Sequence, residues 1–184
     1  MLYGLSCRDG GRLCIRNLFI LFANPLHHRR RNIEIRAGRV DRGPNAWRNR
    51  AREPAGLAAV QAAAWDPIVV WAGEALGARL ELAEGVRFVA QPAAALAAIR
   101  AEIGKFAPPF ALAALASATT LTGSALLALA LARRRLTVEE AWAAAHVDED
   151  WNIRQWGEDA DAARRRAARY DEFAAAARMI AALA

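Results

Sequence analysis

The sequence is poor in lysine, cysteine and histidine. Only Lys105 is a lysine among the 25 basic residues, so arginine supplies nearly all of the positive charge, and the formal net charge is +6. Arginine-rich, alanine-rich chains are typical of GC-rich genomes, so this charge is weak evidence for nucleic-acid binding. The two cysteines, Cys7 and Cys14, have no metal-ligand or CxxC spacing. We therefore expect a reducing compartment, the bacterial cytoplasm, with the mitochondrial matrix as its eukaryotic counterpart.

Motifs of the common enzyme classes are missing as well. The sequence contains no nucleophile elbow, Walker loop, GxGxxG or HExxH. His146 and Asp150 are spaced one helical turn apart and could hold a metal ion, but two ligands on one helix are too few. The acids at 148–150 could serve acid–base chemistry, yet no partner set accompanies them. We expect no catalytic residues, no cofactor and no metal.

Residues 1–50 form a basic segment without sustained hydrophobic periodicity. Two interpretations remain open, a basic arm that contacts nucleic acid or membrane and a disordered leader. The apolar run at 18–23 is short and lacks a cleavage pattern, so we expect no signal peptide. The expected organisation is an irregular segment at 1–50 followed by a helical domain at 51–184.

The helical domain begins near Pro54, with apolar residues at steps of three and four up to Gly77. Asp66-Pro67 interrupts this pattern, so either the helix kinks or Asp66 caps a second helix. Trp65 and Trp71 are predicted to be structural anchors. Residues 80–88 give a weak hairpin signal, and a further helix is expected at 92–104. The predicted fold class is mainly α, with about six helices and at most one short β-hairpin.

An uncharged run at 106–132 is long enough to span a bilayer. Its centre, SATTLTGS, contains Gly123 and reads better as a joint. We expect two short buried helices, about 110–119 and 124–134, and no stable membrane insertion. The last helix has an apolar stripe, while arginines at 164–169 form the opposite face and are expected to pair with Asp161 and Glu172.

The segment Thr137–Gly157 is predicted to be one helix. Thr137 and Glu140 fit a capping box, and Gly157 suits the position after the last turn. Spacings of four and three place five residues on one face: Trp142, His146, Glu149, Ile153 and Trp156. A carboxylate such as Glu149 beside indoles would be partly desolvated and would need a cationic or N–H partner. The face is therefore predicted to bind another protein.

Four stretches resemble the Atp12-type assembly chaperones of ATP synthase: QAAAWDPIVVW, GVRFVAQP, LTGSALLALALA and EEAWAAAHVDEDWNIRQWGEDADA. The resemblance covers about residue 51 to the end, and its most specific part is the D-E-x-W-x-x-x-x-W-G motif at 148–157. Where the family usually has glutamine after the aromatic residue, this chain has Asn152.

The resemblance implies a chaperone that binds the free alpha subunit of the catalytic F-one head and prevents its aggregation before alpha pairs with beta. We expect the chain to be a monomer. The family's functionally important acidic residue falls at Glu149. The residues expected to bind the partner are Asp148, Glu149, Trp151, Asn152 and Trp156. For Trp151 and Trp156 the alternative is that they hold the helix in place. The residues expected to be structural are Trp65, Asp66, Trp71, Gly123 and Gly157.

Family members carry an N-terminal β-rich domain, of which 1–50 shows no trace. A frameshift or wrong start would explain this, and the chain would then be the helical half of a chaperone. Two alternative functions stay open: a small membrane protein that spans at 106–132, and a nucleic-acid binder that uses 27–50 and 164–169, whose binding would weaken steeply with salt.

Overall fold

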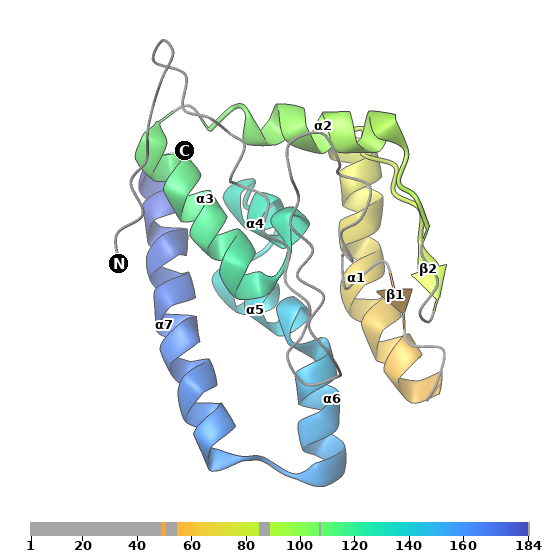
Figure 1. The fold of residues 1–184 in the computed structure, drawn as a ribbon, viewed down its shortest axis with the longest axis vertical. Coiled ribbons are helices and arrows are strands. Elements are labelled where there is room, and N and C mark those ends of the chain that lie inside the picture. The colour runs from red at the N-terminus through yellow and green to blue at the C-terminus, as the bar shows by residue number, and fades with distance from the viewer. Residues whose placement is uncertain (1–48, 51–54, 85–88, 107, 184) are drawn as a thin grey trace.

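The chain folds into a bundle of helices (Figure 1). The computed structural model describes residues 49–50, 55–84, 89–106 and 108–183. This part contains seven helices and two very short strands. The mainly-α prediction is confirmed. The elements are β1 (Asn49–Arg50), α1 (Ala55–Ala75), β2 (Ala83–Glu84), α2 (Ala93–Ile103), α3 (Pro109–Thr122), α4 (Ala125–Ala132), α5 (Val138–Ala145), α6 (Val147–Trp156) and α7 (Ala160–Leu183).

Helix α4 forms the centre of the core. All six residues from Leu126 to Leu131 are buried, as expected for a helix that is hydrophobic all round. Helices α3 and α7 lie side by side, while α1 packs against α4 and α6 (Figure 1). Many of the buried side chains are alanines, which allow close helix–helix approach but bury little area each.

The predicted joint between α3 and α4 is confirmed. Gly123 has φ 67°, a left-handed conformation that glycine adopts without a Cβ penalty. The Ser124 hydroxyl then accepts a hydrogen bond from Leu127 N at 3.2 Å and caps α4. Within the described residues, no helix combines the length and the apolar character needed to cross a bilayer. The described part of the run at 106–132 thus forms two helices. The prediction of burial is confirmed for α4 but wrong for α3, which buries one side only and leaves Phe110 66% exposed.

Helix α1 continues through Pro67, so the alternative of a second helix capped by Asp66 is wrong. Pro67 lacks the N–H of a regular helical hydrogen bond. Buried side chains before and after the proline, Trp65 and Ile68 with Ala72, hold both halves of the helix on the core. Gly77 follows the helix with φ 70°, as predicted for its end.

The prediction of one helix over 137–157 is wrong, because the chain breaks at His146 into α5 and α6. The imidazole Nδ1 of His146 lies 2.8 Å from the carbonyl oxygen of Trp142, the acceptor that the His146 backbone N–H would use in a regular α-helix. The backbone N–H of His146 donates to Ala143 O at 3.1 Å. The capping box of Thr137 and Glu140 is confirmed, as is the end of α6 before Gly157.

This break explains the three consecutive acids. Asp148, Glu149 and Asp150 lie in the first turn of α6, not in the middle of a long helix. Negative side chains there interact favourably with the positive end of the helix dipole. The break therefore removes the conflict with helix propensity that a single helix would have.

The predicted hairpin at 80–88 is only partly testable, because residues 85–88 lie outside the described part of the chain. Ala83–Glu84 is the strand β2, and it pairs in parallel with β1. Residues 80–82 are not in a strand. The expectations for 1–48 likewise concern residues that the structure does not describe.

Candidate partner-binding site

Helix α6 and the end of α5 are both held by hydrogen bonds from α1. Gln61 Nε2 donates to Asp148 Oδ1 at 2.7 Å, and the buried indole of Trp65 donates to Ala144 O at 2.8 Å. Near the start of α1, a Cβ built on Gly56 would lie 2.6 Å from the Trp151 ring, so the ring sits against the helix backbone. Asp148 and Trp151 thus face the protein's own α1.

Among the predicted partner-binding residues, Trp156 is exposed and the others are half-buried. The Glu149 side chain is 27% exposed, and Trp156 is 86% exposed at the last turn of α6. Asn152 is half-buried in the turn between them. The helix that follows the break therefore offers a partner a partly accessible carboxylate and an exposed indole.

The prediction that Trp142 and Trp156 lie on the same helical face is wrong. Trp142 is buried and packs on His146, Tyr170 and Phe173, with ring centroids 4.0, 5.4 and 5.4 Å away. Trp156 is exposed. The break at His146 resets the helical register, so residues before and after it no longer share a stripe.

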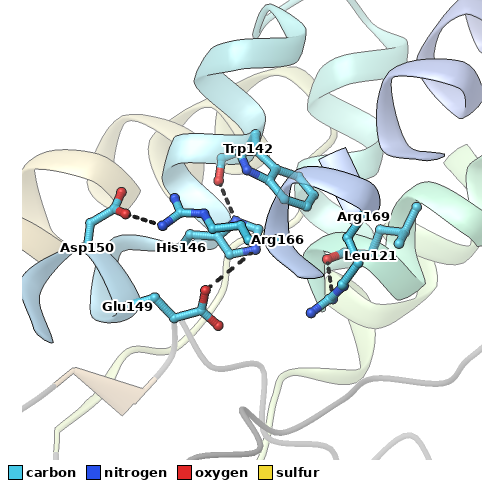
Figure 2. Close-up of polar contacts among 7 residues, drawn as sticks. All are labelled: Leu121, Trp142, His146, Glu149, Asp150, Arg166 and Arg169. Atoms are coloured by element: carbon cyan, nitrogen blue, oxygen red, sulfur yellow. Dashed lines mark hydrogen bonds and ion pairs between the residues drawn. The ribbon is translucent and has the colours of Figure 1, made fainter. Parts of the chain in front are cut away.

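His146 lies between Trp142 and Glu149 (Figure 2). Its Nδ1 contacts the Trp142 carbonyl, and its Nε2 lies 3.9 Å from Glu149 Oε2. Burial lowers the pKa of His146; the Trp142 carbonyl and Glu149 act in the opposite direction, while Arg166 and Arg169 lower it further. The imidazole is therefore held neutral at neutral pH.

The arginines of α7 tie neighbouring helices together. Arg166 forms an ion pair with Asp150 of α6, and Arg169 donates to Leu121 O of α3 at 3.0 Å (Figure 2). Arg164 pairs with Asp161, as predicted. Asp150 is thus engaged by an arginine, and the described residues contain no group of three or more potential metal ligands.

The remaining predicted structural residues lie in or beside the core. Trp71 is half-buried against the core cluster and Asp66 is half-buried on α1. Two contacts of α6 carboxylates were not predicted from the sequence: Gln61 with Asp148, and Arg166 with Asp150. Gln61 was detectable as the polar residue four positions before Trp65 in an otherwise apolar stretch. Nothing local marks Arg166, because its contact depends on how α7 returns along α6.

Solved structures of two proteins are similar to this chain in both sequence and fold. The chain is 51% identical to Atu1473 from Agrobacterium tumefaciens, a proposed chaperone, with TM-score 0.72 over 74% of this chain and 51% of that chain. It is 35% identical to Atp12 from Paracoccus denitrificans, with TM-score 0.69 over 73% of this chain and 57% of that chain. A point variant of the Paracoccus protein matches at 34% identity and TM-score 0.69.

No protein-family model matches the chain. The chain spans slightly more than half the length of the relatives it matches. Both the fold and the sequence of its helical part agree with the resemblance found in the D-E-x-W-x-x-x-x-W-G motif. The helical part of this chain belongs to the Atp12 family.

Proposed function

We propose that this chain is an ATP synthase assembly chaperone that binds the unassembled alpha subunit in the bacterial cytoplasm. The observation that carries this proposal is the 35% identity and common fold with Atp12 over 73% of the chain. The function is binding without chemistry. The alpha subunit exposes apolar surface that beta later covers, and a bound chaperone lowers the population available for aggregation.

The accessible residues of α6 make the contact. Glu149 accepts charge-assisted hydrogen bonds from an arginine or from backbone amides of the client. Trp156 adds apolar area, since an indole that is 86% exposed loses water when a partner covers it. Asp148 and Trp151 act indirectly, because their contacts with α1 hold α6 in place.

The experiment measures capture of purified alpha subunit by the full chain, with beta as the specificity control. Glu149→Gln removes the charge of the half-buried carboxylate. Asp148→Asn is its matched control on the neighbouring residue, because asparagine keeps the Oδ1 atom that accepts from Gln61. We expect Glu149→Gln to weaken binding at least about tenfold, the effect of one lost charge-assisted hydrogen bond. Asp148→Asn should keep the wild-type affinity for alpha under conditions where it is folded.

Circular dichroism and thermal melting of both variants separate recognition from folding. Glu149→Gln should keep the helicity and melting temperature of the wild type. If the folded wild-type chain does not capture alpha, the proposed function is wrong for this chain. If Asp148→Asn and Glu149→Gln lose affinity equally, the assignment of Glu149 as the contacting residue is wrong.

A further inference from the structure

His146 occupies the break between α5 and α6, the helix that carries the proposed site. Its side chain is 5% exposed and meets groups from three helices: the Trp142 carbonyl of α5, Glu149 of α6, and Arg166 with Arg169 of α7. A buried titratable group at a helix break, directed at the carboxylate of a proposed binding site, can control that carboxylate.

Hydrogen bonding fixes the tautomer of the neutral ring. A carbonyl oxygen can only accept, so Nδ1, at 2.8 Å from Trp142 O, carries the proton. Nε2 then presents a lone pair toward Glu149 Oε2 at 3.9 Å. Two acceptors cannot hydrogen-bond each other. The neutral imidazole therefore leaves the Glu149 carboxylate available for donors from a partner (Figure 2).

Protonation reverses this relation. The imidazolium gains an N–H at Nε2 and becomes a charged donor facing the carboxylate. Glu149 would need to approach by only about 1 Å to reach the usual length of a charge-assisted hydrogen bond. A carboxylate engaged in this ion pair is a weaker acceptor for a client's arginine or amide groups.

We propose that His146 is the positioning residue of Glu149, and that its protonation draws this carboxylate into an internal ion pair and weakens client binding. The inference rests on the proposed function for its effect on the client, but the coupling between the two side chains does not. Burial is the main cause that lowers the pKa of His146; among the charged groups, Glu149 on α6 favours the protonated form, whereas Arg166 and Arg169 on α7 oppose it. Arg166 is in turn paired with Asp150.

The first test needs no client. The ring of His146 is titrated by NMR in the full-length wild type and in Glu149→Gln, with His146→Gln used to assign its signals among the three histidines. The proposal expects Nδ1 to carry the proton in the neutral ring and the pKa of His146 to fall in Glu149→Gln, because a carboxylate that stabilises the imidazolium has been removed. An unchanged His146 pKa would overturn the coupling and with it the proposal.

The second test measures the Kd for alpha subunit at pH 7.5 and at a pH one unit below the His146 pKa that the titration gives. We expect wild-type binding to weaken about fivefold at the lower pH, because about nine-tenths of the rings are then protonated and one lost charge-assisted hydrogen bond is worth about tenfold. His146→Gln should show the same Kd at both values, whatever its affinity, while the matched control His28→Gln keeps the wild-type change. Equal pH dependence in wild type and His146→Gln would overturn the proposal. Loss of wild-type binding already at pH 7.5 would instead count against the proposed function, and the titration would still decide the coupling.

Discussion

The contact between α1 and the end of α5 can be tested by replacing Trp65 with phenylalanine. Trp65 is 3% exposed, and its Nε1–H donates to Ala144 O at 2.8 Å. Phenylalanine keeps most of the apolar ring but cannot donate. The buried carbonyl of Ala144 would then lose this donor, which costs about 1 to 3 kcal/mol. The smaller ring also leaves a void, which adds about 1 kcal/mol.

The total expected loss is about 3 kcal/mol, which corresponds to a decrease in melting temperature of roughly 10 °C for a domain of this size. Thermal melting followed by circular dichroism measures it, with urea unfolding for the free energy. Trp156→Phe is the control: Trp156 is 86% exposed and its replacement should leave the melting temperature unchanged. A Trp65→Phe variant that melts within about 2 °C of the wild type would refute the reasoning that this hydrogen bond anchors α1.

Three further predictions concern the joint of the core and two titrating groups. Gly123→Ala should lower the free energy of unfolding by about 1 kcal/mol in urea melts, because φ 67° is unfavourable for alanine; an unchanged midpoint would contradict this. Burial acts to raise the pKa of Glu102, but hydrogen bonds and charges of Lys105 and Arg133 outweigh it and lower the pKa below 4.5. The ionised Glu102 carboxylate therefore stabilises the fold above about pH 4.5, and this contribution is lost as the pH falls further. Glu102→Gln should lower the melting temperature at pH 7, and the melting temperature of the variant should fall less in acid than that of the wild type. An equally steep fall in both proteins would count against the Glu102 ion pairs. The pKa of His146 is lowered from 6.5 in the folded protein, so the unfolded chain binds a proton at this residue at a higher pH than the folded protein does. The free energy of unfolding therefore falls as the pH drops below about 6.5. His146→Gln should remove this part of the pH dependence, and a variant whose melting temperature changes between pH 5 and 7 as in the wild type would contradict the prediction.

The helices of the core were predictable because their signals are local. Gly77, Gly123 and Gly157 each lie at a helix end where the sequence placed one, with positive φ in every case. The capping box of Thr137 and Glu140 is also a local pattern and was found at the predicted place. Such signals depend on residues within one or two turns of each other, which a single sequence displays directly.

The candidate site was less predictable because its geometry depends on distant contacts. At the break, the His146 side chain hydrogen-bonds to the Trp142 carbonyl, and the Trp142 ring packs on Phe173 of α7. The hydrophobic periodicity of the sequence does not show these contacts. Asp148 and Glu149 look equivalent in sequence. The structure distinguishes them because Gln61, 87 residues before Asp148, donates a hydrogen bond to the Asp148 carboxylate.

The long separation between α1 and α6 also has a consequence for the order of folding. The hydrogen bonds of Trp65 and Gln61 join residues that are 79 and 87 positions apart. Closing so long a loop costs chain entropy before any contact is gained, so these contacts form after the local helix pairs. During synthesis α1 precedes α5 and α6, so its contacts with them can form only after α6 has been made. We expect the helix that carries Glu149 and Trp156 to reach its final orientation late in folding.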